Sequence, residues 1–158
     1  MDLAAEPVLR HMLIPLDGSP LAEQVLESAA GLGRLMQADY RLLRAYGPLV
    51  STRLDPLSYS MVRGMELPVE QLRAQAQDYL NRVAERLKGQ GLEVQAQVVL
   101  GHHPASAILD TAGGPGVDLI AVETHGRRGL PRLLLGSVAD KVIRGASTPV
   151  LVHRSPGQ

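Results

Sequence analysis

The chain has 158 residues, of which 45% are hydrophobic and 20% are charged, a balance typical of one globular domain with a sizeable core. Lys plus Arg equals Asp plus Glu at 16 each, so no net charge draws the protein towards nucleic acid or an anionic membrane. The absence of Cys excludes disulfides and thiolate catalysis, and the absence of Phe and Trp removes the aromatic platforms on which single-stranded nucleic acid stacks. We therefore expect no nucleic-acid partner.

The first residues resemble neither a signal peptide nor a membrane anchor. Asp2 and Glu6 precede the first basic residue, Arg10, and no long apolar core follows. No run in the chain approaches the roughly 18 apolar residues of a membrane span. These features predict a cytoplasmic protein with no membrane partner.

A strand, a turn and a helix are predicted at the beginning of the chain. Residues 11–16 form an apolar run that ends at Asp17-Gly18, a pair typical of a turn after a buried strand. Ser19-Pro20 then supplies an N-cap and a first-turn proline. Apolar residues recur at helical spacing from there to about Met36.

Strands and helices alternate along the rest of the chain. Residues 47–67 show no periodicity, and we expect a variable loop there. Ser137 and Asp140 have the spacing of a capping box at the start of the last helix. Strands are predicted over 40–46, 92–100, 117–122 and 150–154, and helices over 69–89, 104–112 and 137–148. This alternation predicts an α/β fold with an open parallel sheet and helices on both faces.

Two loops are candidates for one ligand site, because ligands of open α/β sheets bind at the carboxyl ends of strands. One loop, residues 15–19, follows the first strand, and the other, residues 122–138, follows the fourth. Gly126 and Gly136 allow close approach of a ligand to the backbone, and Ser137 begins a helix whose N-terminus favours a phosphate. The alternative is ordinary turn chemistry beside a solvated basic face.

No catalytic or metal-binding set is evident, so we expect no enzyme. His102 and His103 follow the third strand without Asp, Glu or Cys at ligand spacing, which favours exposed imidazoles over a metal site. His125 either contacts a phosphate or packs within its loop. No nucleophile, base and orienting group occur together, and the P-loop motif is absent.

The sequence resembles the universal stress protein family over nearly its whole length, from MLIPLDGSPLAEQVLESAAGL to GRRGLPRLLLGSVADKVIRGASTPVLVHR. The resemblance implies a single domain over 1–158, with a core at about 9–154 and a Rossmann-like five-stranded sheet in the order 3-2-1-4-5. The ATP-binding branch of the family carries G-x-x-G, nine residues, then G-[ST]. Gly126 and Gly136-Ser137 match this motif, whereas Glu123 occupies the position of the first glycine.

This resemblance implies that ATP or a related adenine nucleotide binds between the two loops. The residues expected to border adenine and ribose are Pro15, Leu16, Asp17, Ala45 and Val122. Backbone N–H groups are expected to bind the phosphates at Gly126, Gly136, Ser137 and Val138. Asp17 would hold Mg²⁺ if a triphosphate binds, and its alternative role is to brace the turn before Ser19. Slow ATP hydrolysis, or phosphorylation of Ser137, would be the limit of any catalysis.

The resemblance also implies a stress-response role as a nucleotide-dependent homodimer. Universal stress proteins commonly pair through the C-terminal strand, here residues 149–154. An apolar strand at a sheet edge can recruit a second chain.

Glu123 leaves two functions open. Its carboxylate would repel a phosphate about 4 Å away by roughly 1 kcal/mol in water. It could instead pair with Arg127 or Arg128, or accept a hydrogen bond from a ribose hydroxyl, and nucleotide binding would be retained. If it closes the pocket, the chain is a stress-protein module that acts through protein contacts alone. On the sequence alone, Glu123→Gly is expected to tighten ATP binding.

Overall fold

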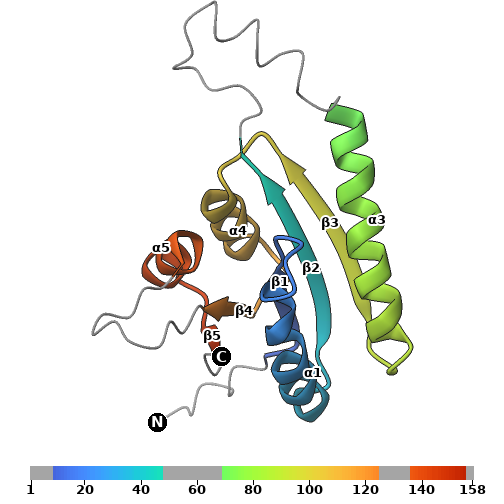
Figure 1. Ribbon diagram of the computed structural model, residues 1–158. Coiled ribbons are helices and arrows are strands. Elements are labelled where there is room, and N and C mark those ends of the chain that lie inside the picture. The colour runs from blue at the N-terminus through green and yellow to red at the C-terminus, as the bar shows by residue number, and fades with distance from the viewer. Residues whose placement is uncertain (1–8, 48–68, 125–135, 156–158) are drawn as a thin grey trace, which may run out of the picture.

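The structure, a computed structural model, describes residues 9–47, 69–124 and 136–155 (Figure 1). Its centre is a parallel five-stranded sheet in the order β3-β2-β1-β4-β5. The strands are β1 (His11–Pro15), β2 (Asp39–Tyr46), β3 (Val94–Leu100), β4 (Leu119–Thr124) and β5 (Val150–Arg154). The predicted fold class and strand order are confirmed.

The helices lie close to the predicted ranges, although the last one ends at Gly145 and not at residue 148. They are α1 (Val25–Met36), preceded by the 3₁₀ turn η1 (Ala22–Gln24), then α3 (Val69–Lys88), α4 (Pro104–Gly113) and α5 (Ser137–Gly145). The first helix begins later than predicted, because Leu21 is the N-cap of η1 and Gln24 is the N-cap of α1. The predicted N-cap, Ser19, lies in the preceding turn, where its Oγ accepts the Ala22 N–H at 3.1 Å. Apart from Gly47, the predicted loop 47–67 lies outside the described residues.

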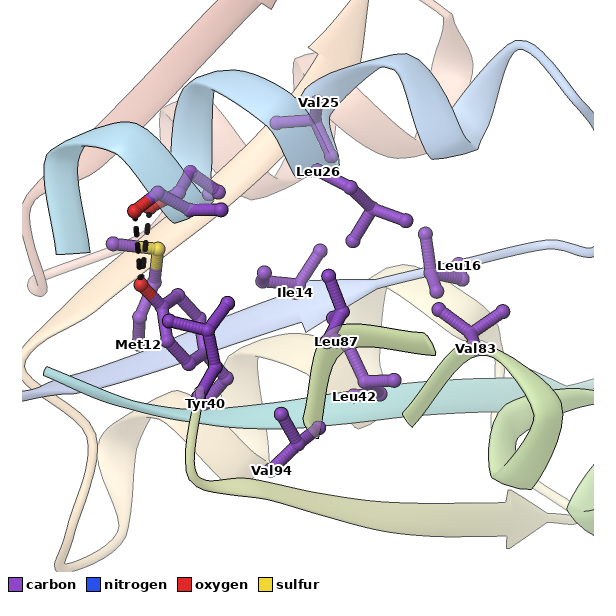
Figure 2. Close-up of a cluster of buried hydrophobic side chains, with 14 of the residues drawn as sticks. Met12, Ile14, Leu16, Val25, Leu26, Tyr40, Leu42, Val83, Leu87 and Val94 are labelled. Carbon is purple, nitrogen blue, oxygen red and sulfur yellow. Dashed lines mark hydrogen bonds between the residues drawn. The ribbon is translucent and has the colours of Figure 1, made fainter. Parts of the chain in front are cut away.

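The larger part of the core lies between the sheet and helices α1 and α3 (Figure 2). Met12 and Ile14 of β1 and Leu42 of β2 contribute side chains that are at most 1% exposed. Tyr40 is equally buried, and its hydroxyl lies 3.4 and 3.3 Å from the carbonyl oxygens of Ala29 and Ala30 in α1 (Figure 2).

The opposite face of the sheet is covered by α4 and α5. Leu13, Leu43 and Ile120 point to this side and pack with Ile108 of α4 and with Val142 of α5. Successive residues of each strand therefore face different helices, as expected of a parallel sheet that is buried on both faces.

Two further predicted details are wrong. The fourth strand spans 119–124 and not 117–122, because its last residues pair with β5, Glu123 opposite His153 and Thr124 opposite Arg154. The capping box does not form at α5, whose N-cap is Gly136. The Asp140 carboxylate instead accepts a hydrogen bond from Arg144 Nε at 2.9 Å.

Candidate functional site

A cavity of about 310 Å³ opens at the carboxyl ends of β1 and β4. The chain runs from β1 to β2 and β3 on one side of the sheet, whereas β4 and β5 lie on the other side of β1. The winding direction therefore reverses between β1 and β4, which is where ligands of open α/β sheets bind. The volume is within the range of small-molecule sites, about 300–1,000 Å³.

Most of the residues predicted for the site line this cavity. Those that do are Pro15, Leu16, Asp17, Ala45, Val122, Glu123, Gly136, Ser137 and Val138. Gly126, the remaining predicted residue, lies outside the described part of the chain. The structure thus brings the 15–19 loop and the start of α5 to one place, as the sequence predicts.

Ser19 of the predicted 15–19 loop also lines the cavity. Residues of the cavity wall that were not predicted are Leu21, Ala22, Leu43, Pro104, Ile108 and Ala139. Leu43 could have been found from strand alternation, because it lies two residues before Ala45 and faces the same side. Pro104 and Ile108 come from α4, and no motif in the sequence connects that helix with the two glycine-containing loops.

The turn after β1 is held by its own hydrogen bonds. Asp17 Oδ1 accepts the N–H of Ser19 at 2.8 Å, which is the bracing role predicted for Asp17. The N–H of Leu16 donates to the carbonyl of Leu43 at 2.8 Å. Gly18 has a φ of 87°, a backbone conformation that L side chains rarely adopt. The turn therefore presents a defined surface to the cavity.

The N-terminus of α5 forms the other polar wall. Gly136 has no side chain with which to cap the helix, and the first helical hydrogen bond runs from the N–H of Asp140 to the carbonyl of Gly136 at 2.9 Å. The N–H groups of Ser137, Val138 and Ala139 thus precede the helical pattern. Amides in this position, at the positive end of the helix dipole, favour an anion.

Glu123 lies in the cavity wall, but its carboxylate is held by β5. Oε2 lies 2.5 Å from Nδ1 of His153, and Oε1 accepts hydrogen bonds from the N–H and the hydroxyl of Ser155 at 3.0 and 2.5 Å. A carboxylate only accepts, so His153 donates through Nδ1–H. The Glu123 side chain is 4% exposed.

Strand alternation explains this orientation. Leu119 and Ala121 of β4 belong to the core on the α1 side of the sheet, whereas Ile120 and Val122 belong to the core on the α4 side. Glu123 continues the first row, and its carboxylate turns along the sheet edge towards β5. The cavity remains open with this side chain in place. The alternative partners Arg127 and Arg128 lie outside the described residues.

The predicted histidines take no part in this cavity where they can be placed. His102 and His103 are exposed in the turn between β3 and α4, as predicted. His125 lies outside the described residues. Within residues 9–47, 69–124 and 136–155, no group of three His, Asp or Glu side chains is arranged to hold a metal ion. In the same ranges, no helix combines the length and apolar character needed to cross a membrane.

Comparison with curated proteins gives one family. Residues 9–154 match the model of the universal stress protein family. Universal stress protein MJ0531 of Methanocaldococcus jannaschii is 30% identical over 151 residues, which cover 96% of this chain and 85% of that protein. Universal stress protein YxiE of Bacillus subtilis is 30% identical over 153 residues, which cover 93% of this chain and all of YxiE.

Solved structures give the same fold. The structure of MJ0577 from Methanocaldococcus jannaschii has a TM-score of 0.73 at 26% identity, and the match covers 96% of this chain and 99% of MJ0577. A universal stress protein in complex with cAMP has a TM-score of 0.65 at 22% identity, over 94% of this chain and 99% of its own. The Archaeoglobus fulgidus protein in complex with dAMP has a TM-score of 0.60 at 19% identity, over 92% and 98%.

The family match spans nearly the whole chain, and the sheet order and the cavity at the switch point agree with it. The chain belongs to the universal stress protein family.

Proposed function

We propose that this chain binds an adenine nucleotide, ATP in particular, in the cavity between β1 and β4, and acts as a cytoplasmic regulatory protein whose partner contacts depend on occupancy. The observation that carries the proposal is the meeting of the Asp17 turn and the α5 N-terminus at the switch point of the sheet. Two proteins of the same fold have been solved with adenine nucleotides, cAMP and dAMP.

The cavity wall is divided in a way that suits a nucleotide. Leu43, Ala45, Ile108 and Val122 provide apolar surface for a base. The start of α5 provides N–H groups for a phosphate. Base and phosphate would then lie at opposite ends of the cavity, with the ribose near Asp17.

The position of the Glu123 carboxylate also supports binding. Its two oxygens accept hydrogen bonds from His153 and Ser155, so it is directed towards β5 rather than towards the start of α5. The electrostatic penalty expected from a carboxylate facing a phosphate is correspondingly smaller.

The second candidate function is a stress-protein module that acts through protein contacts and leaves its cavity empty. One observation favours it, namely that a Glu side chain occupies the position of the first glycine of the nucleotide motif. The same experiment decides between the two functions.

The purified protein is denatured and the supernatant is analysed for nucleotides, and the refolded or dialysed protein is titrated with ATP and Mg²⁺ in a calorimeter. Released adenine nucleotide, or a saturable heat signal, is expected. If no nucleotide is released and no heat is detected, the proposal is wrong and the protein-contact module stands.

We also propose that the protein forms a homodimer through β5. This strand is at the edge of the sheet, next to β4, and Val152 is 41% exposed. An exposed apolar edge strand is suited to pairing with its symmetry mate. Light scattering at micromolar concentration should give twice the 16.9 kDa mass of the chain, and a monomer would contradict the proposal.

A further inference from the structure

A cationic side chain that does not line the cavity lies directly behind the cavity's Asp17 turn. In β2, Leu43 and Ala45 line the cavity, whereas Leu42 points to the opposite face and packs in the core beneath α1 and α3. Arg44, two residues after Leu42, faces the same side of the sheet as Leu42. Arg44 is therefore a charged residue directly after a core residue, Leu42, on this face of β2.

The guanidinium of Arg44 is placed between two aromatic rings. Its central carbon lies 4.8 Å from the ring centre of Tyr46 and 5.1 Å from that of Tyr79 in α3. Both distances are within the range of cation–π attraction. The guanidinium therefore contacts aromatic rings from both β2 and α3.

Tyr79 is itself fixed by further contacts. Its hydroxyl donates to Glu23 Oε1 at 2.9 Å, and Glu23 Oε2 accepts from Arg86 Nη2 at 2.6 Å. Burial, followed by the hydrogen bond from Tyr79 to Glu23, raises the pKa of the Tyr79 hydroxyl, which stays protonated and able to donate. This network joins η1 and α3 to the Arg44 guanidinium.

Gly18 is where the guanidinium meets the turn. A Cβ built on Gly18 would lie 2.2 Å from Nη1 of Arg44, so the guanidinium packs on the bare backbone of this residue. Gly18 connects Asp17 and Ser19, which both line the cavity and are joined by the hydrogen bond from the Ser19 N–H to Asp17 Oδ1. The Arg44 guanidinium therefore contacts the backbone that connects these two cavity residues.

We propose that Arg44 is a positioning residue for the nucleotide site: held between Tyr46 and Tyr79, its guanidinium seats Gly18 and so fixes Asp17 and Ser19 in the cavity wall. The inference rests on the proposed nucleotide binding for its ligand, but the positioning itself can be measured without a ligand. It also gives a reason, independent of backbone conformation, why residue 18 is a glycine.

The test compares Arg44→Met and Arg44→Lys with Arg41→Met as the matched control. Arg41 is in the same strand, but it lines a separate pocket with His11 and Asp39 at the other end of the sheet. Hydrogen exchange of the Ser19 amide is measured by NMR in the full chain. We expect exchange to be about tenfold faster in Arg44→Met and unchanged in Arg41→Met, relative to amides in α1.

Affinity for AMP and for ATP with Mg²⁺ is then measured by calorimetry. We expect about tenfold weaker binding for Arg44→Met and about threefold for Arg44→Lys, which keeps the charge but lacks the planar group. Because Arg44 acts through the turn, Arg44→Met combined with Asp17→Asn should weaken binding by less than the product of the two single effects.

The outcomes separate the two claims. If the unsubstituted protein binds neither nucleotide, the proposed function is wrong, and the exchange of the Ser19 amide still decides the role of Arg44. If the Ser19 amide exchanges at the same rate in Arg44→Met as in Arg41→Met, the inference is overturned. Fully multiplicative effects of the Arg44 and Asp17 substitutions on affinity would overturn it as well.

Discussion

Replacing Glu123 with Ala should destabilise the protein by about 2–4 kcal/mol, although Glu123 lies near the carboxyl end of β4. The substitution removes the acceptor of the Ser155 N–H and hydroxyl, and Ser155 is 8% exposed, so water has little access to replace it. A buried donor left without a partner costs about 1–3 kcal/mol. The His153 side chain is 25% exposed and can hydrogen-bond to water instead, so losing its hydrogen bond to Glu123 adds less to the destabilisation.

The assay is urea denaturation of Glu123→Ala, Glu123→Gln and Ser155→Ala. The Gln variant keeps an oxygen for Ser155 and should lose only about 1 kcal/mol. The midpoint should shift without a change in the urea dependence of the unfolding free energy. A loss below about 0.5 kcal/mol for Glu123→Ala, or full additivity with Ser155→Ala, would refute the reasoning, because contacting residues are expected to show coupled effects.

Further predictions concern the core and the cavity. Gly33→Ala should lower stability by about 1–3 kcal/mol, because its Cβ would lie within 2 Å of the Tyr40 hydroxyl. The control is Gly31→Ala, whose Cβ would have nothing within 4 Å and which should raise stability by up to about 1 kcal/mol. Equal melting temperatures of the two variants would contradict this prediction. Burial raises the pKa of Tyr40 above 10.0, so the folded state retains a proton that the unfolded state loses at alkaline pH. The contribution of Tyr40 to the free energy of unfolding should be fully present below about pH 10 and fall above it. Urea midpoints from pH 8 to 11 should therefore fall less steeply in Tyr40→Phe. Glu123→Gly should change ATP affinity by less than about threefold, because the carboxylate is directed to β5, and a tenfold gain in calorimetry would show that it faces the phosphates.

The spacing of apolar residues and the Gly and Pro residues between them were enough to predict the helices and strands. The helix that begins at Val69 and the strand that ends at Tyr46 appear where the periodicity places them. The end of β4 was not predicted, because its last two residues are extended by pairing with His153 and Arg154, about 30 positions away along the chain. Strand ends set by a distant partner leave no local signal.

The position of the site was also predicted from the sequence, but its side-chain contacts were not. The family motif and the turn after β1 identify the two loops, and the structure places their described residues around one cavity. The contact of Glu123 with Ser155 and the placement of Arg44 behind Gly18 were not predicted, because both depend on which face of a strand a side chain takes and on what lies across from it. The charge of Glu123 suggested repulsion of a phosphate, whereas its hydrogen bonds give it a structural role.

The hydrogen bonds between Glu123 and Ser155 have a practical consequence for protein engineering. Ser155 follows the last residue of β5, so Glu123 in the cavity wall is hydrogen-bonded to a residue one position beyond the final strand. A truncation that stops at Arg154 would leave every strand complete, but it would remove the Ser155 N–H and hydroxyl that donate to the Glu123 carboxylate. Shortened or tagged variants of the protein should therefore retain Ser155, and any affinity tag should be attached after it.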